Sequence, residues 1–166
     1  MLEIRKYGDK VLRKKASQIK DINGEVVELA RAMVKTMYDA PGIGLAAPQV
    51  GFSIRLITVD LTVGEDPSSL FILVNPEIKE KEGEDLDEEA CLSIPGIREM
   101  VKRPFRVLVK GYDLEGKERE IEAEGLLARV FCHEVDHLDG VLFIDRLTPL
   151  KRRLALKRLR KQLSQA

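Results

Sequence analysis

The sequence predicts an α+β fold in which mixed and antiparallel β-strands surround a central helix that carries the pattern H-E-x-x-H. Further helices are expected in the N-terminal part and at the C-terminal end. Three observations support this class: apolar residues recur at helical spacing in three places, short apolar strands fill the middle of the chain, and glycine or proline marks the boundaries. The 166 residues, 44% of them hydrophobic, suffice for one domain that spans residues 1–166.

The first predicted helix covers residues of about 25–39. Its apolar side chains recur with the period of a helix: Val26, Leu29, Ala30, Met33, Val34 and Met37. Either Asp21 or Asn23 is placed to cap its start, and Pro41-Gly42 follows its end. The glycine-punctuated segment 42–51 is expected to be a turn or loop that leads into a strand.

Five strands are expected in the middle of the chain, at residues 53–60, 71–75, 97–101, 105–112 and 117–123. Pro76 should end the second strand, because proline cannot donate a hydrogen bond to a neighbouring strand. Residues 77–89 hold eight acidic side chains and are predicted to form a solvated segment. Residues 113–116, Asp-Leu-Glu-Gly, suit the turn of a hairpin between the last two strands.

The formal net charge is zero, but the charge is unevenly distributed. Residues 151–166 contain seven basic side chains and no acidic one, which leaves 21 basic against 28 acidic side chains in the rest of the chain. A basic helix is predicted at about 149–164, with four leucines along one stripe: Leu150, Leu154, Leu159 and Leu163.

Nothing in the sequence indicates a membrane or a secretion route. No apolar run approaches the roughly 18–20 residues that cross a bilayer, so no membrane contact is expected. The N-terminus has neither the apolar core nor the cleavage site of a signal peptide. A cytoplasmic location is therefore expected, in which Cys91 and Cys132 serve chemistry or packing before they serve a disulfide.

Both histidines of the chain lie in the segment His133-Glu134-Val135-Asp136-His137. Helical periodicity over residues 126–138 places His133 and His137 one turn apart on the same face, where two imidazoles can bind one metal ion. Glu134 follows the first of these ligands and can act as a general base on a metal-bound water. The alternative is a pair of surface histidines on an ordinary helix.

The third metal ligand has to be chosen among a few remaining donors. The extended zinc-protease pattern fails because residue 143 is Phe, and no glutamate follows Glu134. A thiolate with two imidazoles and one open position is a recognised catalytic ligand set. This favours Cys91 as the third ligand, and the alternative is that Cys91 is a buried small apolar residue. Asp145 is the lesser option, and Asp136 is expected to be exposed or to support a ligand.

Cys132 is not expected to join this ligand set. It immediately precedes His133, so its side chain points about 100° away around the helix. We therefore predict that Cys132 is a packed thiol.

Three separated segments resemble the motifs of the peptide deformylases. Residues 42–49, GIGLAAPQ, match G-x-G-L-A-A-x-Q, and residues 133–137 match H-E-x-D-H. Residues 89–93, EACLS, match E-G-C-L-S except that Ala90 replaces the usual glycine. The resemblance covers essentially the whole chain. It implies an enzyme that hydrolyses the formyl group from the N-terminal formylmethionine of newly synthesised polypeptides and releases formate.

The resemblance also implies roles for individual residues. Cys91, His133 and His137 would bind one divalent metal ion, Fe²⁺ before Zn²⁺, Ni²⁺ or Co²⁺, with Glu134 as general base. The side-chain amide of Gln49 and the backbone N–H of Leu92 would stabilise the oxyanion. Four residues match positions that bind the substrate: Ile43, Gly44, Leu126 and Val130. For three of these, Ile43, Leu126 and Val130, a place in the hydrophobic core is the alternative.

Further expectations follow from the same resemblance. The protein would act in the bacterial cytoplasm, and its basic C-terminal helix would contact ribosomal RNA, because Lys and Arg bind phosphate. A solvated helix packed on the body is the alternative. Ala90 would cost about 1 kcal/mol if its position requires a positive φ. The rival functions are a metallopeptidase and a protein with a structural metal.

Overall fold

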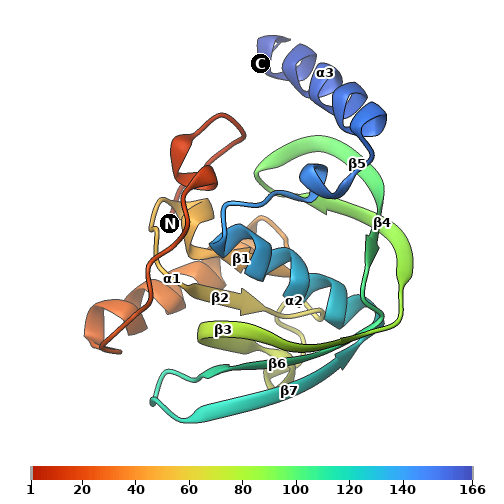
Figure 1. The fold of residues 1–166 in the computed structure, drawn as a ribbon. Coiled ribbons are helices and arrows are strands. Elements are labelled where there is room, and N and C mark those ends of the chain that lie inside the picture. The colour runs from red at the N-terminus through yellow and green to blue at the C-terminus, as the bar shows by residue number, and fades with distance from the viewer. Residues whose placement is uncertain (1, 166) are drawn as a thin grey trace.

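Two antiparallel sheets and three α-helices make up the structure (Figure 1), a computed structural model that describes residues 2–165. The helices are α1 (Gly24–Asp39), α2 (Gly125–Leu138) and α3 (Pro149–Gln165). The larger sheet has the order β1-β2-β3-β6-β7, with bounds Gly44–Ala46, Leu56–Val59, Phe71–Glu82, Arg106–Tyr112 and Glu118–Glu124. The smaller sheet pairs β4 (Asp85–Cys91) with β5 (Ile94–Arg103).

Helix α2 lies at the centre of the molecule (Figure 1) and contacts strands β1, β2, β3, β6 and β7 of the larger sheet. Ten of its 14 residues are buried, so both its apolar and its polar side chains face protein. Phe131 is fully buried and meets Phe71 of β3 edge to face, with ring centroids 5.4 Å apart. The functional side chains of α2 are therefore held by a packed core and not by a mobile surface element.

The main features of the predicted fold are confirmed. The three predicted helices are present, and the α+β class with antiparallel sheets is observed. The predicted hairpin turn joins β6 to β7, where Asp113 N–H donates to the Lys117 carbonyl and Gly116 adopts a φ of 83°. Four short 3₁₀ helices, η1 (Lys10–Arg13), η2 (Ala47–Val50), η3 (Pro67–Ser69) and η4 (Phe143–Arg146), occur in addition among residues 2–165.

The predicted strand end at Pro76 is wrong, because β3 continues to Glu82. Its pairing with β6 shifts register between Val74 and Glu77 and again between Ile78 and Glu80. Where the pairing is irregular, a residue without an N–H costs no regular hydrogen bond, so Pro76 lies at a register shift without ending the strand. The acidic segment 77–89 correspondingly forms the end of β3 and most of β4, although most of its side chains are exposed as expected.

The predicted leucine stripe on the C-terminal helix is also wrong. Ala155 and Leu159 of α3 are buried, whereas Leu150 and Leu154 are 60% and 51% exposed. Leu159 lies about 140° from Leu154 around a helix, so the four leucines cannot share one face. Helix α3 contacts β5 and η4, and it extends from the top of the molecule in Figure 1.

No helix within residues 2–165 combines the length and the apolar character that would let it cross a bilayer.

Asn23 should contribute to stability as the N-cap of α1. Its side-chain oxygen accepts a hydrogen bond from Val26 N–H at 3.1 Å, which satisfies one of the free donors at the helix start. We expect Asn23→Ala to lower the free energy of unfolding by about 1 kcal/mol in urea denaturation. Asp21→Ala is the matched control, because Asp21 is exposed and does not cap the helix. An equal loss in both variants would contradict this assignment.

Candidate metal centre and substrate cleft

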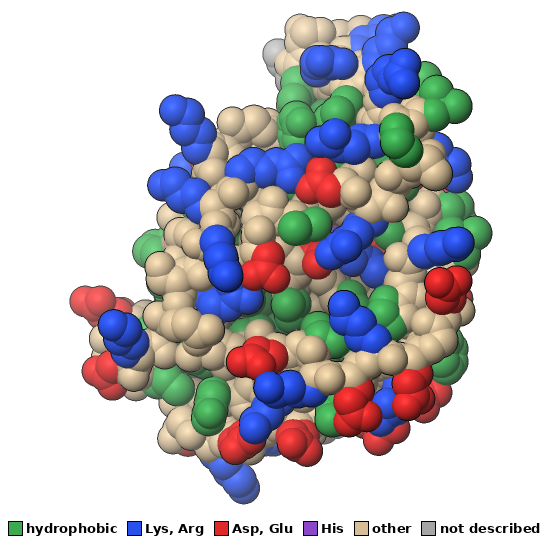
Figure 2. Space-filling view, in the orientation of Figure 1, with side chains coloured by type: hydrophobic (Ala, Val, Ile, Leu, Met, Phe, Trp, Pro, Cys, Tyr) green, Lys and Arg blue, Asp and Glu red, His purple; other side chains and the backbone are tan. Residues whose placement is uncertain are grey.

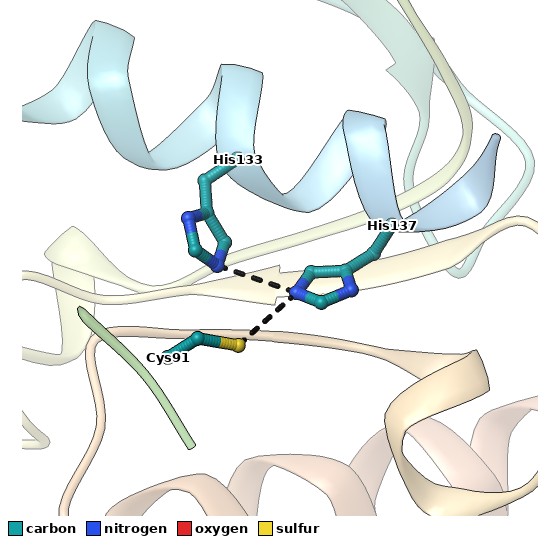
Figure 3. Close-up of side chains that lie close together, drawn as sticks. All are labelled: Cys91, His133 and His137. Atoms are coloured by element: carbon teal, nitrogen blue, oxygen red, sulfur yellow. Dashed lines mark hydrogen bonds between the residues drawn. The ribbon is translucent and has the colours of Figure 1, made fainter. Parts of the chain in front are cut away.

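Three side chains converge at one point beside α2. His133 and His137 project from consecutive turns of the helix, and Cys91 lies at the end of β4 (Figure 3). His137 Nε2 is 3.3 Å from His133 Nε2 and 3.4 Å from Cys91 Sγ, and the ligand atoms all lie within 4.8 Å of one another. Two ligands about 2.1 Å from one ion at the tetrahedral angle are about 3.4 Å apart, so this spacing fits a bound metal.

The electrostatics of the two imidazoles also fit a cation. Burial alone lowers the pKa of His133, but the charge of Glu134 and contacts with Cys91 and Glu89 raise it well above its usual value. Burial together with the nearby positive charge of His133 keeps the pKa of His137 well below its usual value. The surroundings of the two imidazoles thus favour a positive charge at this point, which a bound cation would supply.

Glu89 orients His133 and was not predicted as a functional residue. Its carboxylate is buried and accepts a hydrogen bond from His133 Nδ1 at 2.9 Å. With a proton on Nδ1, the Nε2 lone pair of His133 faces the metal position. Arg103 donates to both carboxylate oxygens at 2.8 and 2.9 Å, and Arg129 donates to one of them at 2.7 Å. Burial raises the pKa of Glu89, but these hydrogen bonds outweigh it and lower the pKa to about 2.

Neither aspartate that was considered as a ligand belongs to the ligand cluster. Asp136 accepts hydrogen bonds from Arg103 at 2.6 Å and from Arg146 at 2.8 Å, so it anchors the arginine that holds Glu89. Asp145 instead pairs with Arg13. Asp136 therefore supports the site indirectly, and Asp145 is excluded by its position.

Glu134 lies deep in the cleft with one carboxylate oxygen, Oε1, that has no hydrogen-bond partner among the described residues. Burial raises its pKa to about 7. A Cβ at Gly44 of β1 would lie 2.5 Å from Glu134 Oε2 and 2.8 Å from Val130 Cγ1. The absence of a side chain at Gly44 therefore makes room for the carboxylate, and a carboxyl group with this pKa can exchange a proton near neutral pH.

Gln49 is oriented by hydrogen bonds at both ends of its side-chain amide. Its Oε1 accepts from Ala46 N–H at 2.9 Å, which turns Nε2 toward Ser93 Oγ at 3.1 Å and Cys91 Sγ at 3.6 Å. Ser93 is fully buried and was not predicted to act on Gln49. Leu92, whose backbone N–H is the other predicted donor, follows Cys91 directly in the chain.

A cleft of about 500 Å³ opens beside these side chains. Its lining includes all the predicted site residues except His137: Ile43, Gly44, Gln49, Cys91, Leu92, Leu126, Val130, His133 and Glu134. Leu126 is 52% exposed and Ile43 is partly buried, whereas Val130 also belongs to the core. Strand β1 is an edge strand that pairs with β2 alone among the described strands. On its other edge Ala46 N–H already donates to Gln49, and the edge at Gly44 is open to an extended peptide.

Ala90 and Cys132 are accommodated without strain. Val63 and Asn75 are the non-glycine residues of positive φ among those described, so the backbone cost considered for Ala90 does not arise. Cys132 is buried as predicted, and burial raises the pKa of its thiol. Neither residue therefore disturbs the centre.

Comparisons with known proteins agree with this site. The model of the polypeptide deformylase family matches residues 1–153. A peptide deformylase of Thermodesulfovibrio yellowstonii is 57% identical over 160 residues, which cover 96% of this chain and 97% of the relative. One from Syntrophobacter fumaroxidans is 47% identical over 166 residues, covering 100% and 98%.

Solved structures are similar as well. The crystal structure of a peptide deformylase from Legionella pneumophila has a TM-score of 0.93 and 43% identity, with 99% of this chain and 96% of that chain covered. A peptide deformylase from Synechococcus elongatus in complex with actinonin has a TM-score of 0.90 and 43% identity, covering 95% and 86%. The likeness therefore extends over the sheets, the helices and the cleft.

Glu89→Gln should destabilise the metal-free protein in a pH-dependent way. The low pKa of Glu89 means that its carboxylate stabilises the fold above pH 4.5, and that this contribution is lost as the pH falls toward about 2. Near neutral pH the variant should lose about 3–5 kcal/mol, because two buried arginines lose a charged partner. Urea denaturation across this pH range should show the difference from wild type shrinking on acidification.

Glu88→Gln provides the matched control for this experiment. Glu88 is the exposed neighbour of Glu89 and pairs only with Arg98 among the described residues. Its removal should change stability little at any pH. A wild-type advantage over Glu89→Gln that stays constant from neutral to acidic pH would argue against the ionised carboxylate as the stabilising group.

Proposed function

This chain belongs to the peptide deformylase family, the metal-dependent hydrolases that remove the formyl group from newly made polypeptides, and we propose which of its residues carry that reaction. Cys91, His133 and His137 bind one divalent metal ion, and Glu134 is the general base. The observation that carries this proposal is the convergence of one thiol and two imidazoles beside a buried carboxylate with a free oxygen.

The metal is Fe²⁺ in this proposal, with Zn²⁺, Ni²⁺ or Co²⁺ as substitutes. One sulfur and two nitrogens suit iron and zinc alike, so the ligand set supports a divalent ion and the family resemblance favours iron. When bound, the ion supplies Lewis acidity, which lowers the pKa of a water in the open position. Glu89 helps by keeping the Nε2 lone pair of His133 directed at the ion.

Glu134 moves the proton that the hydrolysis requires. Its unpartnered Oε1 accepts a proton from the attacking water, and the same carboxyl group later donates it to the departing amine. Burial raises the pKa of Glu134 above its usual value, which favours uptake of the proton from water. Gly44 contributes by leaving the space in which this carboxylate lies.

Two N–H donors stabilise the negative charge that develops on the formyl oxygen. The Gln49 side-chain amide is fixed by Ala46 and Ser93, so its Nε2 is oriented before the substrate arrives. The backbone N–H of Leu92 is the second donor. Removing a prearranged donor of this type by mutation raises the reaction barrier by about 3 kcal/mol in other enzymes.

The substrate enters as an extended chain in this proposal. The N-formyl-Met end of a nascent polypeptide pairs with the open edge of β1 at Gly44, next to Ile43, the residue that precedes the strand. The methionine side chain contacts Ile43, Leu126 and Val130. Residues 1–166 act as one catalytic domain, and the protein acts in the bacterial cytoplasm, where formylated chains are made.

Contact between α3 and ribosomal RNA is a further part of the proposal. The exposed face of α3 carries basic side chains, and only Ala155 and Leu159 of the helix are buried. Arg152 pairs with Asp145 and Arg158 pairs with Glu99. The other lysines and arginines of α3 form no ion pair among the described residues, so they are available to phosphate groups, and such contacts weaken with salt.

Glu134→Gln should abolish formate release and leave metal binding intact. We expect anaerobically purified wild type to release formate from formyl-Met-Ala-Ser, with little action on acetyl-Met-Ala-Ser, while metal content is measured on the same samples. The variant keeps all three ligands but cannot accept the proton, so its rate should fall by at least about 100-fold. Glu84→Gln, at an exposed site, should behave like wild type. An unchanged rate in Glu134→Gln, or loss of its metal, would refute this role.

Reversing the charge of the helix should reduce ribosome binding. Lys157→Glu combined with Lys161→Glu removes two exposed basic side chains from α3. We expect less co-sedimentation with ribosomes at low salt than for wild type, with the difference reduced at high salt. The control Lys15→Glu with Lys20→Glu makes the same charge change at exposed positions elsewhere. If both double variants lost ribosome binding to the same extent, α3 would have no specific role in that binding.

A further inference from the structure

A second cavity, of about 390 Å³, lies on the side of α2 that faces away from the metal centre. Its lining includes Cys132 and Val135 of α2, which point away from His133 and His137 around the helix, and Asp139, which follows the last residue of α2. Its volume falls within the range of about 300–1,000 Å³ that is typical of small-molecule sites. The cavity is separate from the substrate cleft, because the two have no lining residue in common. They are linked only indirectly, through the hydrogen bonds that Arg103 of this cavity donates to Glu89 of the cleft.

Basic side chains dominate the charge of this cavity. Three acidic residues line it, Glu77, Asp136 and Asp139, together with five basic ones: Arg55, Lys81, Lys102, Arg103 and Arg146. Lys and Arg side chains are also prominent across the middle of the face drawn in Figure 2, with fewer Asp and Glu side chains among them. The excess of positive charge favours an anion over a cation as the occupant.

Each carboxylate of the cavity already has a basic partner. Asp136 accepts hydrogen bonds from both Arg103 and Arg146, at 2.6 and 2.8 Å. Asp139 pairs with Arg55 at 3.0 Å, and Glu77 pairs with a lysine outside the cavity at 2.8 Å. No carboxylate is left over to neutralise a further ammonium group or to bind a metal ion.

Two lysines of the cavity remain without an acidic partner. Lys81 extends from β3 and Lys102 from β5, so they reach the cavity from different sheets. Within residues 2–165 neither ammonium group forms an ion pair or a side-chain hydrogen bond. Arg146 lines the same cavity, half-exposed, and donates to Asp136 through Nε and one terminal nitrogen. These three groups supply several N–H donors to one anion.

We propose that this cavity binds the phosphate group of a small molecule, either inorganic phosphate or a phosphate monoester. Lys81, Lys102 and Arg146 contact the phosphate oxygens, and a doubly charged tetrahedral group matches donors that approach from separate strands. Pro76 and Val135 give the cavity an apolar wall against which the organic part of an ester packs. The proposal is independent of the residue roles assigned to the metal centre.

The test is isothermal titration calorimetry of the metal-loaded full chain with two probes, inorganic phosphate and glycerol 3-phosphate. Wild type should bind at least one probe saturably, and tighter binding of the ester would identify a phosphate monoester as the ligand. Lys81→Met with Lys102→Met should weaken binding at least about tenfold, because each lysine removes a charge-assisted hydrogen bond. Formate release should be unchanged, since neither lysine lies in the cleft.

The matched control is Lys110→Met with Lys117→Met, which removes two charges from β6 and its hairpin outside the cavity. It should bind both probes as wild type does. Absence of saturable binding to wild type would overturn the proposal. Wild-type affinity in the Lys81/Lys102 variant would overturn it as well, because it would place the anion elsewhere, for example at the metal centre. An equal loss of affinity in the Lys110/Lys117 control would also overturn the proposal, because it would show that only the net charge of the protein matters.

Discussion

The buried carboxylate of Glu89 is the group on which the rest of the centre depends. It joins β4 to Arg103 at the end of β5 and to His133 and Arg129 of α2, so one side chain connects three elements. A buried charge is tolerated only when it is paired and hydrogen-bonded, and here Glu89 accepts from two guanidinium groups and an imidazole. The same bonds that hold the smaller sheet against α2 therefore place Cys91, two residues after Glu89, opposite His137.

The arginines around Glu89 extend this arrangement to both sides of α2. Arg103 donates to Glu89 on the side of α2 that faces the metal centre and to Asp136 on the opposite side. Arg146 of η4 donates to Asp136 as well. Asp136 therefore has a structural role within the H-E-x-D-H segment. Its carboxylate holds Arg103, and Arg103 in turn orients Glu89 behind His133. The second cavity lies where this network reaches the surface, so its basic lining is partly a consequence of how the metal centre is supported.

The sequence predicts the three helices and the cluster of Cys91 with two histidines, because the helices and the histidine pair depend on local spacing. His133, Glu134 and His137 can be placed on one helix from their positions alone, and the family motifs bring Gln49 and Cys91 to them. Residues that act across elements could not be found in this way: Glu89 looked like part of a solvated acidic run, and nothing marks Arg103 or Arg129 as its partners. The strand through Pro76 was missed because local rules do not foresee a bulged pairing with β6.

Strand β1 has a consequence for the timing of the reaction. It is three residues long and offers its free edge inside a cleft whose walls are formed by α2 and the end of β4. Only a single extended strand fits such an edge; a chain end already paired in a sheet or wound in a helix has its backbone groups occupied. In the binding mode proposed for β1, removal of the formyl group would therefore compete with folding of the substrate protein. Chain ends that are still emerging and unstructured would then be the best substrates.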